Sequence, residues 1–208
     1  MVENDLRNPK FEALMDFSNE KIYFLMALAR PKANKEITKS QRVFVRLPIR
    51  SMESYYQNLV KIEADCVRTG LNMYMYVSVN ARDTVSAYEN FKKKLVEYEN
   101  QAMHGKEDFR KPLMNLDVTW YSACLKPNAR GTKYFLLDID NKTQELRDRL
   151  TDVVLPLSGP ILVEKETRNG YHWIVKPFDV RVLEGLEDVS VQKDGLLYLG
   201  CTGFNEEI

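Results

Sequence analysis

The order of apolar and polar positions in the first third of the chain predicts one helix, one strand and a second helix. Residues 18–30 begin with a capping serine and continue with good helix formers, which predicts a helix. Residues 42–49 alternate at first, as a half-buried strand does, and Pro48 indicates a strand end or an edge position. Ser51 is suited to cap a helix that ends at Gly70, a residue typical of helix C-termini.

The middle of the chain predicts a central strand followed by a long helix. Residues 71–80 are rich in aromatic and β-branched side chains, and the strand they predict leads to Asn80 and Arg82. Aromatic residues on strands lie mainly in cores, so this is the favoured position for Tyr74 and Tyr76, ahead of base stacking. Residues 84–103 carry apolar positions at helical spacing, namely Val85, Tyr88, Phe91, Leu95 and Tyr98. The short apolar run 118–125 is compatible with helix or strand.

The last third predicts short strands and one amphipathic helix. The expected strands are residues 133–140, 161–166, 171–175, 189–192 and 196–199, and the expected helix is residues 143–154. Asn169-Gly170 is a strong signal for a tight hairpin turn, and Asp194-Gly195 is expected to turn the last strand pair. The fold class expected from this pattern is α+β, with a mostly antiparallel sheet in the second half.

The chain length predicts one compact body, and the net charge of zero gives the molecule no overall electrostatic field. The 208 residues carry 30 basic and 30 acidic side chains, so any attraction for nucleic acid must be local. Such an asymmetry exists between residues 30 and 50, where a single acid, Glu36, accompanies Arg30, Lys32, Lys35, Lys39, Arg42, Arg46 and Arg50. We expect a helical and basic N-terminal segment over residues 1–40 and one compact module over residues 41–208.

The cysteines and the hydropathy indicate a reducing compartment. Cys66, Cys124 and Cys201 are odd in number and far apart, which argues against a disulfide framework and against a zinc knuckle. No apolar signal core starts the chain, and no segment has the apolar length that spans a bilayer. We expect a cytoplasmic protein without a membrane partner.

Two carboxylates on one strand are the first candidates for chemistry. Because strand side chains alternate, Asp138 and Asp140 are expected on one face and Leu137 and Ile139 on the other, in a core. Carboxylate pairs of this kind hold the divalent metals that bridge a nucleoside triphosphate when substrate oxygens complete the shell.

The predicted hairpin adds groups that suit a phosphate. Arg168 and His172 flank the Asn169-Gly170 backbone, and an imidazole, a guanidinium and backbone N–H groups together can hold a phosphate tail opposite the metals. The combination of carboxylate strand and basic hairpin points toward chemistry on phosphates.

In these segments, over roughly residues 42–200, the sequence resembles the archaeo-eukaryotic primase superfamily, including plasmid and phage primase-polymerases. That family has an apolar strand leading into Asp-x-Asp, similar to residues 135–140, and then a small-residue turn with a histidine, similar to residues 167–172. Residues 72–80 look like a strand that often ends in Asn-Pro there, although Ala81 replaces the proline. Residues 189–199 look like its last catalytic strand and glycine turn.

The resemblance implies a fold, a reaction and its partners. The implied fold is a primase-polymerase-like core, with an RRM-like sheet flanked by helices and an N-terminal α/β unit. The implied activity is template-dependent nucleotide addition or primer synthesis, with Mg²⁺ or Mn²⁺ at Asp138 and Asp140 and the triphosphate at Arg168 and His172. Lys165 and Arg82 are weaker candidates for nucleotide contacts. The implied partners are nucleoside triphosphates, a single-stranded template and a helicase or other replication protein, in a phage or plasmid setting.

One departure leaves alternatives open. The family's last strand contributes a third acidic ligand, but the aligned position here is Ser190, so Asp188 or Asp194 would have to substitute. If neither does, the protein is a non-catalytic, primase-like subunit that binds nucleic acid or a replication partner. A phosphatase of the haloacid dehalogenase type shares the Asp-x-Asp strand and ranks lower, because Lys142 stands where its motif has Thr or Val.

Overall fold

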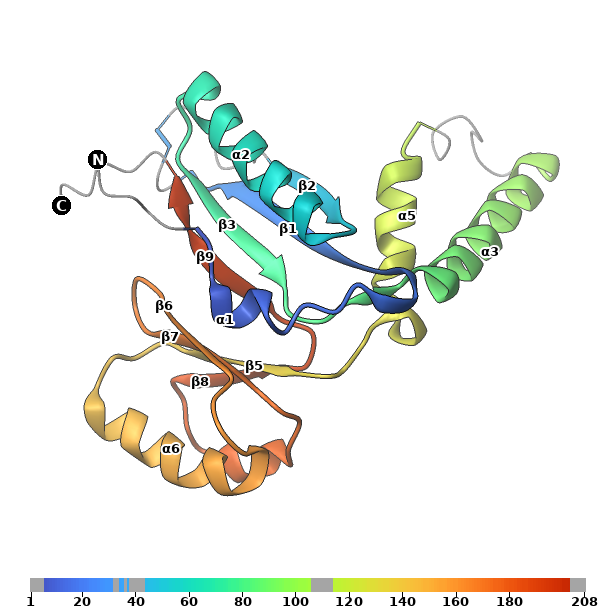
Figure 1. Ribbon diagram of the computed structural model, residues 1–208. Coiled ribbons are helices and arrows are strands. Elements are labelled where there is room, and N and C mark those ends of the chain that lie inside the picture. Colours follow the sequence, from blue (N-terminus) through green and yellow to red (C-terminus); the bar gives the residue numbers. More distant parts are fainter. Residues whose placement is uncertain (1–5, 32–33, 36, 38–43, 106–113, 203–208) are drawn as a thin grey trace. The chain divides into compact units, whose positions relative to one another are not determined.

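The computed structural model describes residues 6–31, 34, 35, 37, 44–105 and 114–202, and these fall into two units (Figure 1). The first unit contains Met1–Met15, Tyr23–Asn80 and Thr132–Ile208, and the second contains Asp16–Ile22 and Ala81–Gly131. The first unit contains residues on both sides of residue 40, and the expected boundary there stays a prediction.

The first sheet of the first unit is antiparallel and has the order β2-β1-β3-β9. Strand β1 (Lys21–Ala29) lies between β2 (Phe44–Ile49) and β3 (Met73–Ser78), and β9 (Leu196–Thr202) completes the sheet beside β3. The strand predicted around Pro48 is therefore confirmed at an edge, and the central strand predicted over 71–80 is confirmed as β3.

The helix predicted over residues 18–30 is wrong. A single 3-10 turn, η1 (Ser18–Glu20), precedes β1, and most of β1 is buried. A strand enclosed on both faces shows no alternation, so its apolar run has the composition of a buried helix. Pairing with strands on both sides overrides the local preference for helix.

Helix α2 (Met52–Thr69) lies across one face of this sheet (Figure 1). Its buried side is formed by Tyr55, Leu59, Ile62 and Cys66. Ser51 accepts a hydrogen bond from the Ser54 N–H, and Gly70 ends the helix in the left-handed conformation with φ 67°. Both predicted ends of this helix are confirmed, because each rests on a local backbone requirement.

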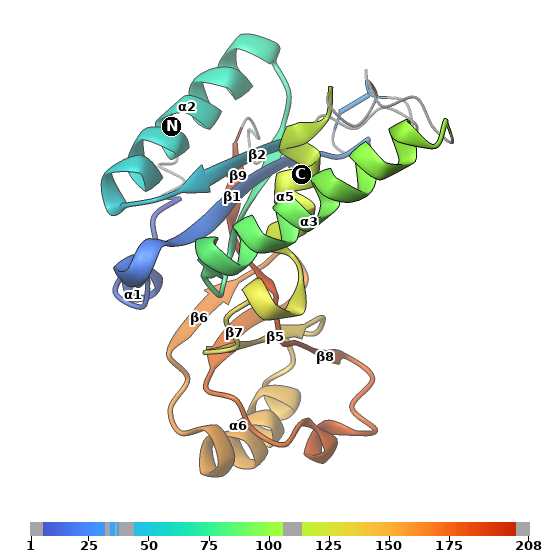
Figure 2. The ribbon, with the colours of Figure 1, turned by 90° about the vertical axis from the view of Figure 1, so that its right-hand side faces the viewer.

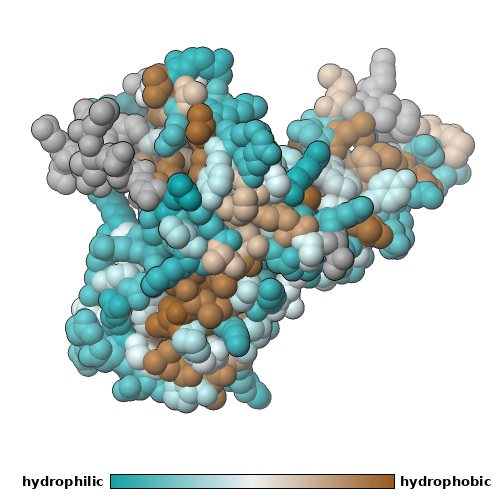
Figure 3. Space-filling view, in the orientation of Figure 1, coloured by the Kyte–Doolittle hydropathy of each residue, from teal (hydrophilic) through white to brown (hydrophobic). Residues whose placement is uncertain are grey.

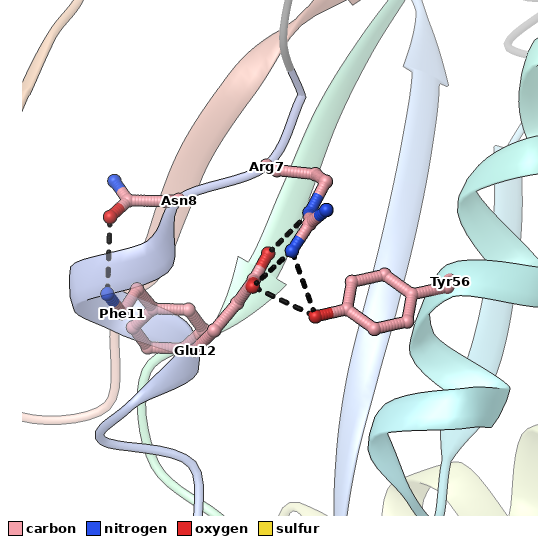
Figure 4. Close-up of polar contacts among 5 residues, drawn as sticks. All are labelled: Arg7, Asn8, Phe11, Glu12 and Tyr56. Atoms are coloured by element: carbon pink, nitrogen blue, oxygen red, sulfur yellow. Dashed lines mark hydrogen bonds and ion pairs between the residues drawn. The ribbon is translucent and has the colours of Figure 1, made fainter.

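A short helix, α1 (Pro9–Glu12), is attached to α2 by polar contacts (Figure 4). The Arg7 guanidinium donates to the Glu12 carboxylate at 3.1 Å and to the Tyr56 hydroxyl at 3.1 Å, and it lies 4.6 Å from the centre of the Tyr56 ring. The Tyr56 hydroxyl in turn donates to Glu12 at 2.9 Å. One tyrosine of α2 therefore contacts both Arg7 and Glu12.

The second sheet of the first unit is also antiparallel, with the order β6-β7-β5-β8. Its strands are β5 (Phe135–Ile139), β6 (Val163–Glu166), β7 (Tyr171–Val175) and β8 (Val189–Gln192). Helix α6 (Gln144–Ser158) and the 3-10 turn η3 (Val180–Leu183) pack against one side (Figure 2). Leu137, Trp173 and Leu150 are fully buried there, and Figure 3 shows further apolar surface over this part of the unit.

The expected pairing of the last two strands is wrong. Strand β8 pairs with β5 in the second sheet, whereas β9 pairs with β3 in the first sheet. The segment between them crosses from one sheet to the other, and the buried Asn80 amide donates to the carbonyls of Tyr134 and Lys193 at this crossing. Turn residues alone cannot distinguish a hairpin from such a crossing.

The second unit is mainly helical. Helix α3 (Thr84–Met103) packs against α5 (Leu116–Cys124). The Phe91 and Trp120 rings meet edge-on, with their centres 5.6 Å apart. Strand β4 (Arg82–Asp83) and turn η2 (Pro127–Ala129) complete the unit. The ambiguous run 118–125 is thus helical. The predicted apolar face of α3 is partly wrong, because Val85 and Tyr88 are more than half exposed and Ala87 is buried instead.

Together these elements confirm a mixed α+β fold with antiparallel sheets. No helix in the described residues is both long enough and apolar enough to cross a bilayer.

Candidate functional site

Four polar side chains form a row across the second sheet. The strand register pairs Lys165 with His172, His172 with Asp138, and Asp138 with Ser190. Directly paired residues project on the same face of a sheet, so these four lie on the face opposite the Leu137 and α6 core. The structure therefore brings Asp138 and His172 together, from adjacent strands and on one face.

His172 is held in a defined orientation. Its Nδ1 accepts a hydrogen bond from the Tyr198 backbone N–H at 3.1 Å, and its Nε2 lies 3.2 Å from an Asp138 carboxylate oxygen. Because Nδ1 is an acceptor, the ring proton belongs on Nε2, where it is donated to Asp138. His172 is 7% exposed, so the ring has little freedom to leave this position.

Asp138 has a second partner and remains partly accessible. Its other carboxylate oxygen accepts from the Gln192 amide at 3.3 Å, and its side chain is 29% exposed. Among the described residues, the partners of this carboxylate are an amide and an imidazole, so a ligand that binds it would compete with these two groups.

The other acidic candidates lie at the exposed end of β5. The Asp140 N–H donates to the Asp188 carbonyl at 2.9 Å, and the Asp188 carboxylate accepts from the Asn141 amide at 3.0 Å. Both aspartates are exposed. Asp194, the other proposed substitute for a third ligand, lies in the crossing between β8 and β9.

The carboxylates present suit a metal that is shared with a substrate. Within the described part of the chain, no three His, Cys, Asp or Glu side chains are grouped closely enough to hold an ion alone. Mg²⁺ is usually held by one or two carboxylates together with water and phosphate oxygens. Asp138 is partly exposed and Asp140 is exposed at the end of the same strand, so each carboxylate is accessible to a metal that arrives with a nucleotide.

The turn between β6 and β7 differs from the expected geometry. The Thr167 N–H donates to the Gly170 carbonyl at 2.9 Å, and the Gly170 N–H donates to the Thr167 hydroxyl at 3.1 Å. Arg168 and Asn169 therefore occupy the centre of the turn, not Asn169 and Gly170. The hairpin itself is confirmed, and Arg168 and Asn169 are exposed at its tip.

Gly170 is needed for a close approach, not for the turn. A Cβ at this position would lie 1.7 Å from the Ile139 carbonyl oxygen and 3.0 Å from the Asn141 nitrogen. The missing side chain lets the hairpin approach the end of β5, directly beside the segment that carries Asp140.

The remaining cationic candidates are dispersed. Lys165 is half-buried beside His172 in the row, whereas Arg82 is 2% exposed in β4 of the second unit. In the basic stretch, Arg30, Lys35, Arg46 and Arg50 are described, while Lys32, Lys39 and Arg42 lie outside the described residues.

Three contacts at the site were missed by sequence reasoning. They are the Gln192 amide on Asp138, the Asn141 amide on Asp188 and the Tyr198 N–H on His172. Strand alternation was a usable signal for Gln192, which lies two residues after Ser190 and shares its face. No sequence signal points to the Tyr198 N–H, because it comes from a strand of the other sheet.

Comparisons of this chain with protein-family models, with curated proteins and with solved structures found no match.

Proposed function

We propose that the chain is a template-dependent nucleotidyltransferase of the primase-polymerase type. The observation that carries the proposal is the register that sets His172 and Ser190 on either side of Asp138, on three adjacent antiparallel strands. The resemblance implies a histidine on a hairpin strand beside Asp-x-Asp and a third ligand on the last catalytic strand, and His172 and Ser190 are the residues that match these two positions.

In this proposal the carboxylates of Asp138 and Asp140 hold Mg²⁺ or Mn²⁺ together with the triphosphate. The metal, when bound, neutralises charge on the phosphates and lowers the pKa of the attacking hydroxyl. A 3′ hydroxyl then forms a bond to the α-phosphorus, the bond to the β-phosphate oxygen breaks, pyrophosphate leaves and the hydroxyl proton passes to solvent.

His172 and the hairpin would orient the triphosphate tail. When no ligand is bound, the Nε2 proton of His172 is donated to Asp138. When the Asp138 carboxylate binds a metal instead, this proton becomes available for a hydrogen bond to a phosphate oxygen. Arg168 and Asn169 are exposed at the hairpin tip, so they are accessible to the β- and γ-phosphates without rearrangement of the sheet.

A second candidate function is nucleotide or nucleic-acid binding without catalysis. Ser190 favours it, because the residue paired with Asp138 on β8 is exposed and lacks a carboxylate. Replacing Ser190 separates the two readings. A carboxylate in the Ser190→Asp variant would lie beside Asp138 and is expected to tighten Mn²⁺ binding in the presence of nucleotide.

The test is incorporation of labelled nucleotides on primed and unprimed single-stranded templates with Mn²⁺ or Mg²⁺. Asp138→Asn and Asp140→Asn should each lower incorporation about 100-fold or more, since each removes a ligand carboxylate at nearly constant volume. Asp117→Asn, an exposed acid of α5, is the matched control and should leave the rate unchanged. Equal product from all four proteins would refute the catalytic assignment.

Titration of Mn²⁺ with a nucleoside triphosphate distinguishes the binder from the enzyme. A wild-type protein that binds nucleotide through Asp138 but forms no product would support the non-catalytic reading. If Ser190→Asp then produced measurable incorporation, the missing third carboxylate would be the reason for inactivity.

A further inference from the structure

The face of the first sheet that turns away from α2 carries an aromatic and cationic surface. Strand β3 alternates in burial, with Met73, Met75 and Val77 almost fully buried on one side. Tyr74 and Tyr76 project on the other side and are only half-buried. This alternation separates the tyrosines from the core in which they were mainly expected.

Neighbouring strands extend this surface with a third ring and a guanidinium. Tyr198 of β9 pairs with Tyr76 in the register, and their ring centres are 5.6 Å apart. The exposed Arg30 lies 5.1 Å from the centre of the Tyr74 ring and donates to the Tyr76 hydroxyl at 3.0 Å. We name Tyr74, Tyr76, Tyr198 and Arg30 the tyrosine face.

The tyrosine face is continuous with the Asp138 and His172 pair. The backbone N–H of Tyr198 is the group that orients His172, at 3.1 Å from Nδ1. Burial raises the pKa of the Tyr76 hydroxyl, and the nearby Asp138 carboxylate adds to that rise. The rings therefore begin beside the proposed nucleotide site and extend along the sheet away from it.

We propose that the tyrosine face binds single-stranded nucleic acid by stacking on successive bases, next to the Asp138 and His172 site. The inference rests on the proposed function in one respect, because it takes that site as the place where the bound strand is copied or extended.

The chemistry of the surface favours nucleic acid over a protein partner. Every base offers a π-face to a tyrosine ring, and an arginine that lies on a ring can also contact a phosphate. Arg46 stands in the same row of the sheet as Tyr76 and Tyr198, through its pairing with Met26. Cations that flank a row of rings complement a polyanion with stacking bases, whereas an apolar protein partner needs a continuous aliphatic patch.

The test is fluorescence anisotropy of a labelled oligothymidylate of about 20 nucleotides, a length that exceeds the site of one such sheet. The full chain is titrated without nucleotide or metal. Tyr74→Leu and Tyr76→Leu remove the π-face but keep apolar volume, and each should weaken binding about tenfold. Tyr74→Phe and Tyr76→Phe keep the ring and should bind nearly as the wild type does.

Matched controls separate this surface from the metal site. Tyr88→Leu alters an exposed tyrosine of α3 and should not change affinity. Asp138→Asn should retain oligonucleotide binding while it abolishes incorporation. If the wild type bound the oligonucleotide in a tyrosine-dependent way but incorporated no nucleotide, the catalytic assignment would be refuted and the tyrosine face would still stand.

A wild-type protein that fails to bind the oligonucleotide, or Leu variants that bind it as the wild type does, would overturn the inference. If a Leu variant does not fold by circular dichroism, photo-cross-linking of wild type to 5-iodouracil oligonucleotides decides the question. Cross-links at Tyr74, Tyr76 or Tyr198 support the inference, and cross-links only elsewhere refute it.

Discussion

Gly170 provides a stringent test of how the site is built. In Gly170→Ala the new Cβ would lie 1.7 Å from the Ile139 carbonyl oxygen, and contacts below 3.0 Å are essentially never seen for a Cβ. The hairpin and the end of β5 must therefore separate by about 1.3 Å to reach 3.0 Å. The nearest atoms belong to backbone, so no side-chain rotation relieves the clash. The separation also strains the Ile139 and Tyr171 pairing, the last pair of the β5 and β7 ladder.

The expected cost is about 3 kcal/mol, the upper part of the range for overpacking, because backbone hydrogen bonds are weakened as well. Urea unfolding followed by circular dichroism measures it. Gly70→Ala is the matched control: its φ is 67° and no atom lies within 4 Å, so it should cost only about 1 kcal/mol of left-handed strain. If Gly170→Ala were no more destabilising than Gly70→Ala, the close approach would not be a feature of the folded protein.

Three further predictions concern single residues of the fold. Asp83→Ala should destabilise the protein by about 1 kcal/mol in thermal or urea unfolding, because Asp83 caps α3 through the Ser86 N–H. That hydrogen bond lowers the pKa of Asp83. The stabilisation of the folded state by this cap is therefore fully present at pH values above the ordinary pKa of 3.8, and it is lost as the pH falls below that value. If Asp83→Ala were still destabilising at pH 2, the capping role would be contradicted. Burial raises the pKa of Cys124 to about 11, so at pH 8 its thiol should react with iodoacetamide about 100-fold more slowly than an ordinary thiol. The free energy of unfolding should also fall as the pH rises from 9 through 11, because the unfolded chain loses this proton first. Mass spectrometry after labelling checks this, and labelling at the rate seen in urea would disprove it. Tyr56→Phe removes the hydroxyl contacts to Arg7 and Glu12. Amide hydrogen exchange should therefore accelerate in residues 7–13, while α2 stays protected. Equal protection in the variant and the wild type would show that the hydroxyl does not anchor α1.

Sequence reasoning succeeded where a local rule decides the structure. Ser51 and Gly70 bound α2, and Pro48 lies on an edge strand, because caps and missing N–H groups act within a few residues. The alternation of Asp138 with Leu137 also held, since strand geometry alone separates their faces.

Sequence reasoning failed where pairing with a strand far along the chain determines the structure. The apolar run of β1 has the composition of a helix, and only its pairing with β2 and β3 shows that it is a strand. Likewise, Asp194-Gly195 looks like a hairpin turn, but β8 and β9 find their partners in different sheets. The partial exposure of Tyr74 and Tyr76 was not predicted for the same reason, because only the position of α2 shows which face of β3 is the core.

Two glycines explain why the register at the site is fixed although the turns are not of the expected type. A Cβ at Gly170 would meet the Ile139 carbonyl, and one at Gly195 would lie 2.6 Å from Leu136. Both glycines therefore permit close packing, one against each end of β5, and neither requires a left-handed φ. A shift of one residue in β5 would move Asp138 to the other face and bring side chains against both contacts. The pairing of Asp138 with His172 thus depends on how tightly β5 is enclosed at its two ends.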